Sequence, residues 1–261
     1  MILDKITKDT KLRVEKAKKE YPLEEMKKQA EVLLADTGFP FEKKLKEEEM
    51  QFICEVKKAS PSKGVIADEF DYLKIAKEYE AAGAAVISVL TEPHFFMGSG
   101  QYLKEIRQEV SSLLLRKDFT IDKYQIYEAK VLGADIILLI CAILDKNTLK
   151  EYIGIADILG LSAIVEVHDE MEMQMAVTAG ARIIGVNNRN LKDFTVDIKN
   201  SIRLRALAPK EICFIAESGI TSHDDIKELS EAQVNGVLIG ETLMRSENKK
   251  EMLDKLRGIS S

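Results

Sequence analysis

The chain has 261 residues, enough for one large domain with a well-buried core. Hydrophobic residues make up 46% and charged residues 31%, and the formal charge of −6 argues against nucleic-acid binding, which usually needs a basic surplus. No apolar run approaches the roughly 20 residues that a membrane-spanning helix needs, and the first residues contain no apolar signal core, so we expect no membrane partner.

Residues 1–48 precede the first predicted strand and are helical in pattern. Amphipathic patterns over Ile2–Lys19 and Leu23–Leu34 are followed by a turn at residues 38–40 and a shorter helical patch over Phe41–Glu49. No linker separates these segments from the rest. We therefore expect residues 1–261 to form a single domain, in which residues 1–48 are an N-terminal helical extension.

Short apolar runs then recur along the chain, rich in Val, Ile and Leu and with almost no polar alternation. This pattern is typical of strands that are covered on both faces, as in parallel sheets. The predicted strands are Phe52–Val56, Ala85–Leu90, Ser112–Leu115, Asp135–Ile140, Ala163–Val167, Arg182–Val186, Ile212–Ala216 and Asn235–Ile239.

Charged segments with helical period separate these strands. The clearest are Asp71–Ala82, Asp122–Leu132, Lys146–Leu159, Asp169–Ala179 and Ser222–Ala232. Several open with a capping residue and close at a glycine. Eight such strand–helix units predict an α/β fold, a (β/α)₈ TIM barrel with an N-terminal helical extension. An open doubly wound sheet is the alternative architecture.

The three cysteines each lie within an apolar run and lack the close pairing of a zinc or redox site. They are Cys54, Cys141 and Cys213. We interpret them as reduced core thiols, which indicates a cytoplasmic protein. No two of the three histidines stand at metal-ligand spacing, so the sequence predicts no metal site.

Charged side chains follow several predicted strands, where a barrel carries its chemistry. Glu55 and Lys57 share one face of the first strand because residues two apart point the same way. The same alternation turns Lys117 and Glu166 inward. A lone Glu-x-Lys could be a structural ion pair, but several such strand ends together predict an acid–base site. With two lysines and a substrate anion in one pocket, like-charge repulsion between the lysines should lower the pKa of one of them, and a nearby glutamate should oppose this effect.

Small-residue turns follow the last two predicted strands, at Ser218-Gly219 and Gly240-Glu241. Backbone N–H groups at such turns can hold a phosphate, and this fold often binds phosphate there. Phe96 and Phe119 stand near the expected mouth and could wall a ring. His168 lies on the face of Glu166 but directly precedes a helix cap, so we interpret it as structural.

Taken together, the motifs resemble the indole-3-glycerol phosphate synthase family over the whole chain. The matching stretches are Glu55–Gly64, Leu90–Glu92 with Phe96–Ser99, Arg116–Phe119, Val165–His168, Gly185–Leu191, Ala216–Ile220 and Leu238–Glu241. Two positions depart from the usual pattern: Arg116 stands where a small or apolar residue is common, and Cys141 where Ala or Val is frequent.

The resemblance implies that 1-(2-carboxyphenylamino)-1-deoxyribulose 5-phosphate undergoes ring closure, decarboxylation and dehydration to give an indole, without cofactor or metal. It implies that Lys117 protonates the ketone oxygen, with the dehydration role of the two lysines left open. The implied catalytic set is Glu55, Lys57, Lys117, Glu166, Asn187 and Ser218. The implied binding set is Ser60, Pro61, Phe96, Phe119, Arg189, Leu191, Glu217, Gly219, Gly240 and Glu241.

Other functions of the same fold stay open at this point. A Schiff-base aldolase would use a strand-end lysine to attack a ketone. A non-catalytic barrel could bind a phosphate ligand as a sensor. A sugar-phosphate isomerase has no evident use for two lysines. In each case the expected partner is a small anionic sugar phosphate, and we expect a monomer or a weak homodimer.

Overall fold

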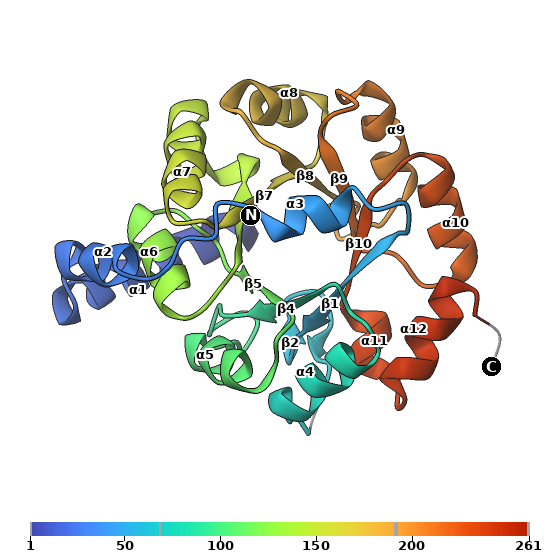
Figure 1. Ribbon diagram of the computed structural model, residues 1–261, viewed down its shortest axis with the longest axis horizontal. Helices are drawn as coiled ribbons and strands as arrows, with labels where there is room; N and C mark the ends of the chain where they lie inside the picture. The colour runs from blue at the N-terminus through green and yellow to red at the C-terminus, as the bar shows by residue number, and fades with distance from the viewer. Residues whose placement is uncertain (1, 68, 191–192, 260–261) are drawn as a thin grey trace.

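The computed structural model describes residues 2–67, 69–190 and 193–259, and in this part of the chain eight parallel strands close into a barrel (Figure 1). In chain order the barrel strands are β1 (Gln51–Val56), β4 (Val86–Leu90), β5 (Leu113–Lys117), β6 (Ile136–Ile140), β7 (Ser162–Val167), β8 (Ile183–Asn187), β9 (Cys213–Glu217) and β10 (Gly236–Ile239). Each strand pairs with its sequence neighbours, and β10 closes the ring on β1. The predicted TIM barrel is confirmed, and every predicted strand matches an observed one.

Helices surround this barrel (Figure 1). They are α4 (Tyr72–Ala81), α5 (Gly100–Glu109), α6 (Lys123–Val131), α7 (Lys146–Ile158), α8 (Glu170–Ala179), α9 (Lys199–Leu207), α10 (His223–Glu231), α11 (Glu241–Arg245) and α12 (Lys249–Arg257), with a 3₁₀ turn η1 (Cys141–Ile143) after β6. The five predicted helices are confirmed as α4, α6, α7, α8 and α10. Asp71, Asp122, Asp169 and Ser222 cap four of them through their side chains, as the sequence suggests.

Two apolar layers hold the barrel together. Side chains that point outward from the strands pack against the surrounding helices, as Cys54 and Val56 do. Side chains that point inward fill the barrel, as Leu115 and Ile164 do. Lys117 and Glu166 follow these two residues at a spacing of two, so the predicted inward direction is confirmed.

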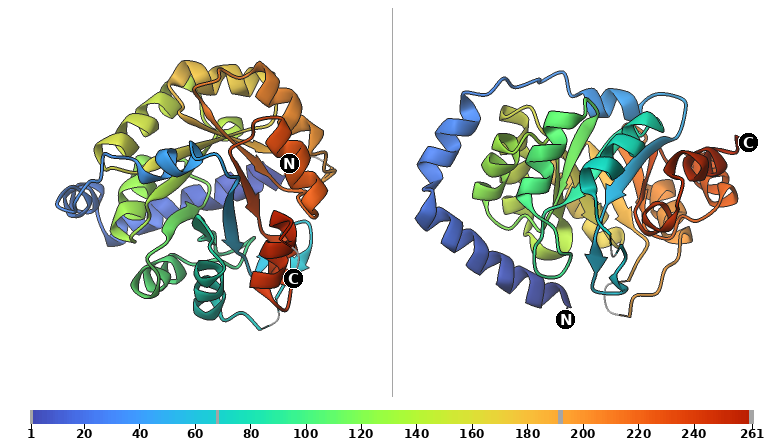
Figure 2. Two further views of the ribbon diagram at one scale, coloured as in Figure 1. Left: turned by 45° about the vertical axis from the view of Figure 1, so that its right-hand side comes forward. Right: turned by 90° about the horizontal axis from the view of Figure 1, so that it is seen from below.

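The N-terminal extension runs from one end of the barrel to the other (Figure 2, right). Helix α1 (Ile2–Glu20) starts beside the carboxyl ends of the strands, α2 (Leu23–Glu31) packs on α6, and α3 (Pro40–Leu45) lies across the opposite opening. Phe41 and Leu45 of α3 insert into the inner core. The extension therefore covers the bottom of the barrel and also borders its mouth.

Some local structure differs from the sequence prediction. The third helical patch is shorter than predicted because α3 ends at Leu45. The loop after β1 contains a small hairpin of β2 (Ala59–Ser60) and β3 (Gly64–Val65). Within the described ranges, no helix combines the length and apolar character needed to cross a bilayer.

Candidate active site at the mouth of the barrel

A cavity of about 650 Å³ opens at the carboxyl ends of the strands. It contains nearly all of the side chains that the sequence singles out. The predicted residues that line it are Glu55, Lys57, Ser60, Pro61, Phe96, Lys117, Phe119, Glu166, Asn187, Arg189, Glu217, Ser218, Gly219, Gly240 and Glu241. Leu191, which the resemblance places in the binding set, lies outside the described residues.

Lys117 is surrounded by carboxylates at the centre of this cavity. Its Nζ donates a short hydrogen bond to Glu217 Oε2 and lies 3.7 Å from Glu166 Oε2. Glu217 reaches the cavity because β9 alternates Cys213, Ile215 and Glu217 on its inward face. The sequence assigned Glu217 to binding only, and its pairing with Lys117 makes it part of the acid–base group.

The charges fix the protonation state of Lys117. Burial lowers the pKa of this amine, but Glu217, Glu166 and Glu55 together raise it above its usual value. The predicted opposing effect of a nearby glutamate is therefore the stronger one for Lys117 in the free protein. Burial also raises the pKa of the Glu217 carboxyl, and the negative charges of Glu166 and Glu55 add to that effect.

Glu55 and Lys57 form a second ion pair across the inward face of β1 and the residue after it. The Glu55 carboxylate is buried, whereas the Lys57 amine is slightly open to the cavity. A side chain at Gly240 would collide with Glu55 Oε1 and with Lys57 Nζ at 2.8 Å. Gly240 thus makes room for the ion pair, in addition to offering its backbone to the cavity.

The turn after β9 has an unusual backbone. Ser218 and Gly219 both adopt positive φ, at 67° and 87°. For Ser218 this conformation costs energy, and such strain is common at functional sites. Asn188 holds the turn by donating its side-chain amide to the Ser218 carbonyl at 3.1 Å. A side chain at Gly219 would collide with Val196, so the loop after β8 packs closely on this turn.

Two aromatic rings form part of the cavity wall. The centroids of Phe96 and Phe119 lie 5.9 Å apart with the rings tilted by 39°. Pro61, in the hairpin loop after β1, lines the same cavity. Arg189 also lines it and donates from its guanidinium to the Phe194 carbonyl at 3.3 Å.

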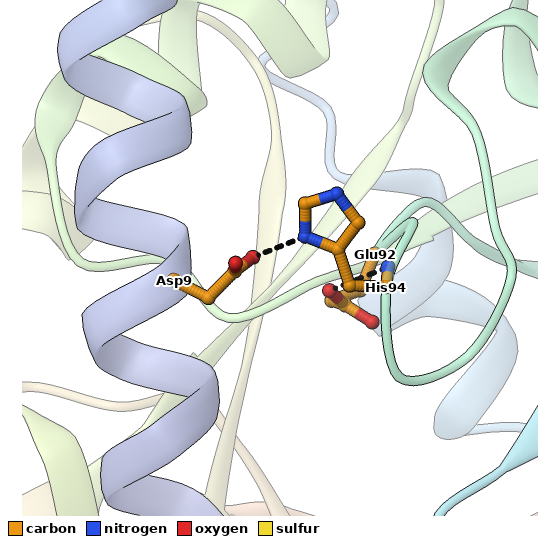
Figure 3. Close-up of side chains that lie close together, drawn as sticks. All are labelled: Asp9, Glu92 and His94. Atoms are coloured by element: carbon orange, nitrogen blue, oxygen red, sulfur yellow. Dashed lines mark hydrogen bonds and ion pairs between the residues drawn. The ribbon is translucent and has the colours of Figure 1, made fainter.

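The loop that carries Phe96 is shaped by Glu92 (Figure 3). Its carboxylate is fully buried and accepts backbone N–H groups of His94, Phe95 and Phe96 at 3.0, 2.7 and 2.9 Å. His94 Nδ1 lies 2.7 Å from Asp9 Oδ2 on α1. Among the described residues, Asp9, Glu92 and His94 lie close enough to share a cation. Both Glu92 oxygens already accept backbone hydrogen bonds, so we assign Glu92 to shaping the loop.

A buried ionic network supports the end of β5 next to Lys117. Asp118 accepts two hydrogen bonds from Arg13 of α1, at 2.7 and 3.1 Å, and one from Thr91 at 2.7 Å. Arg116 donates to Glu128 at 2.6 Å and lies 3.4 Å from Asp118. Arg116 is thus a buried cation that joins β5, α6 and the Asp118 carboxylate that binds Arg13 of α1.

Sequence reasoning missed several residues that line the cavity. Ile2, Leu3 and Ile6 reach it from α1, and Phe194 and Val196 reach it from the loop after β8. The amphipathic pattern of α1 predicts an apolar face but does not say which surface that face covers. No comparable signal marks the irregular loop.

Comparisons with known proteins show what the chain is similar to. A family model described as indole-3-glycerol phosphate synthase matches residues 3–256. An indole-3-glycerol phosphate synthase of Ruminiclostridium cellulolyticum is 60% identical over 258 residues, covering 99% of each chain. One from Lachnoclostridium phytofermentans is 52% identical over 270 residues, covering 99% of this chain and 100% of the relative. The solved 3-hexulose-6-phosphate synthase of Salmonella typhimurium shares the fold at TM-score 0.66 and 14% identity, covering 80% of this chain and 98% of that one.

Proposed function

This chain belongs to the indole-3-glycerol phosphate synthase family, and we propose that its cavity converts 1-(2-carboxyphenylamino)-1-deoxyribulose 5-phosphate to indole-3-glycerol phosphate. The observation that carries the proposal is the Lys117–Glu217–Glu166 group beside the Glu55–Lys57 pair in one cavity. The reaction needs both acids and bases near one ketone carbon. These five side chains supply them from the ends of four alternate strands, β1, β5, β7 and β9.

Lys117 is assigned to the ring closure. The aromatic carbon attacks the ketone carbon, and the ketone oxygen becomes a hydroxyl by taking a proton. An ammonium that three carboxylates keep protonated can donate that proton to the strongly basic oxygen as the bond forms. Glu217, hydrogen-bonded to Lys117, holds the amine in place.

Decarboxylation and dehydration follow. The carboxylate leaves as carbon dioxide and its electron pair restores the aromatic ring. The hydroxyl then leaves as water while a base removes a proton from the adjoining carbon. Glu166 is assigned to this proton transfer, and Asn187 supports it by donating to Glu166 Oε1 at 3.3 Å. Lys57 is assigned to the substrate carboxylate or to expelling the hydroxyl.

Binding is divided between two sides of the cavity. The turns at Ser218-Gly219 and Gly240-Glu241 offer backbone N–H groups to the phosphate. Phe96, Phe119 and Pro61 are assigned to the anthranilate ring. Leu191 stays a predicted member of this wall, and Ser60 and Arg189 stay predicted binding residues.

The test is a fluorescence assay for indole formation from the carboxyphenylamino sugar phosphate. Turnover by the purified chain is expected, and its absence under conditions in which the chain is folded would overturn the proposal. A Schiff-base aldolase would instead give a borohydride-stable adduct on Lys57 or Lys117 with substrate.

A further inference from the structure

His168 lies between two carboxylates that come from different elements. Its Nε2 is 3.5 Å from Glu166 Oε1, and its Nδ1 is 3.1 Å from Glu172 Oε2 on α8. The same Glu172 oxygen accepts the His168 backbone N–H at 2.8 Å. The ring is therefore held at Nδ1, which faces α8, while Nε2 faces Glu166 and the mouth.

This arrangement constrains where the ring carries its protons. A carboxylate only accepts hydrogen bonds when ionised, so the contact with Glu172 requires a proton on Nδ1. In the neutral ring, Nε2 then presents a lone pair to Glu166 Oε1, which also carries lone pairs. Nε2 is shielded from water and has no hydrogen-bond partner among the described residues. The contact is favourable only when one proton lies between Nε2 and Glu166.

The surrounding charges favour that proton. Glu166 on β7, Glu172 on α8 and Glu217 on β9 all act on the ring. Burial lowers the pKa of His168, but the hydrogen bond to Glu172 and these charges raise it above its usual value. Lys117 lies 3.7 Å from the other Glu166 oxygen, and its positive charge opposes protonation of the ring. Further charged groups line the cavity beside the ring: Asp4, Asp169, Arg189, Asp197, Lys199 and Arg203.

We infer that His168 is a positioning residue that shares one proton with Glu166 and connects it to Glu172. The inference rests on the proposed function, in which Glu166 takes a proton from the substrate. With the shared proton on Nε2, Glu166 is free to take the substrate proton, and the ring then releases its Nδ1 proton to Glu172 and stays protonated at Nε2. The Glu172 carboxylate borders a second cavity of about 820 Å³ next to the mouth. The proton can leave there without crossing the substrate.

The pH–rate profile tests the inference in active protein. His168→Gln keeps an amide donor but cannot carry the positive charge of the protonated ring, so the acid limb of the profile should move to higher pH by about one unit. The maximal rate should fall about tenfold, as expected for impaired proton transfer. Glu172→Gln should move the alkaline limb to lower pH, because a charge that favours the protonated ring is gone.

His223→Gln is the matched control, since His223 contacts the Leu256 carbonyl, outside the residues that line either cavity. Its profile should match that of the parent protein. Profiles of His168→Gln and Glu172→Gln that also match the parent would overturn the inference. Glu172→Gln keeps the test valid if His168→Gln does not fold.

A second measurement does not depend on turnover. The chain has only three histidines, so labelled ring signals can be assigned by substitution and followed by NMR across pH. Glu166→Gln should lower the pH at which His168 titrates by about half a unit to one unit. An unchanged midpoint would refute the shared proton. Failure of the proposed function would instead remove turnover from the parent protein and leave this coupling in place.

Discussion

The bottom and the mouth of the barrel both bury glutamates beside basic side chains, but the carboxylate oxygens have different sets of hydrogen-bond partners at the two ends. At the bottom, Glu42 of α3 accepts from Ser162 at 2.5 Å and from Arg182 at 2.9 and 3.2 Å. Arg182 also pairs with Asp157 at 2.9 Å. Both Glu42 oxygens have partners, next to a plug of Phe41 and Leu45 that fills the opening.

At the mouth, the buried glutamates do not all find a partner for each carboxylate oxygen. Three buried glutamates, Glu55, Glu166 and Glu217, face the amines of Lys57 and Lys117. Glu217 Oε1 has no partner among the described residues, and the group borders an open cavity. Buried polar groups normally find partners, and the exceptions concentrate at functional sites. We therefore infer that the charges at the bottom stabilise the fold, whereas the charges at the mouth are available to a substrate.

Lys117→Met should give the largest effect. Loss of the positioned acid should reduce turnover by on the order of 10²-fold or more, while substrate binding stays largely intact. Steady-state kinetics and substrate affinity would be measured, with Lys150→Met on the exposed face of α7 as the control. Turnover within a few-fold of the parent would mean that Lys117 is not the acid.

Glu166→Gln separates a catalytic role from a supporting one. If Glu166 takes the substrate proton, turnover should fall by roughly 10²-fold while affinity for the indole product changes little. If it only balances the charge of Lys117, the loss should be modest and the pH optimum should shift instead. Turnover across pH, with product affinity alongside, distinguishes the two results.

Arg182→Met, at the bottom of the barrel, should lower the stability of the protein and leave turnover largely unchanged. It leaves the buried Glu42 carboxylate with only Ser162 and removes the guanidinium that lies 4.3 Å from the Phe39 ring. Because Arg182 is partly exposed, we expect a loss of about 2 kcal/mol in the free energy of unfolding, below the usual cost of breaking a fully buried pair. Urea unfolding measures this loss. A large fall in turnover of the folded variant would contradict the division between the two ends.

The sequence predicts the barrel better than it predicts what surrounds the mouth. Continuous apolar runs mark the strands, and their alternation places Lys117 and Glu166 inside. The same alternation through Ile215 could have placed Glu217 beside Lys117. By contrast, α5 begins with glycine after Gly98-Ser99, which hides its start, and helix amphipathicity cannot say that α1 reaches the mouth. These contacts depend on tertiary packing between distant segments.

Ser218→Asp should act on binding rather than on chemistry. A carboxylate at the positive-φ turn adds negative charge where we propose that the phosphate binds. Since the phosphate does not react, its binding energy is largely the same in the ground and transition states. We expect KM to rise about tenfold or more and kcat to change less. An unchanged KM would place the phosphate elsewhere.

Arg13→Met tests a charge at the rim of the mouth. Arg13 joins α1 to Asp118, and we expect it to contribute to stability rather than to catalysis. Burial raises the pKa of Asp118, but the charges of Arg13 and Arg116 and the hydrogen bonds from Arg13 and Thr91 lower it below its usual value. A lowered carboxyl pKa adds stability above the unfolded value of about 4, and this stability is lost as the pH falls through the folded pKa. The free energy of unfolding of the parent should therefore exceed that of the variant by about 1 kcal/mol at pH 7, and this difference should become smaller below about pH 4.

Urea unfolding at several pH values measures this gap, and Lys77→Met, from the exposed pair with Glu109, is the control that should change little at any pH. A gap that does not change with pH would mean that Arg13 stabilises α1 by packing alone. Turnover of the folded variant at pH 7 should stay within about threefold of the parent, because Arg13 holds the rim and does not line the cavity. A larger loss would mean that the Arg13–Asp118 pair, which anchors α1, also serves function and not stability alone.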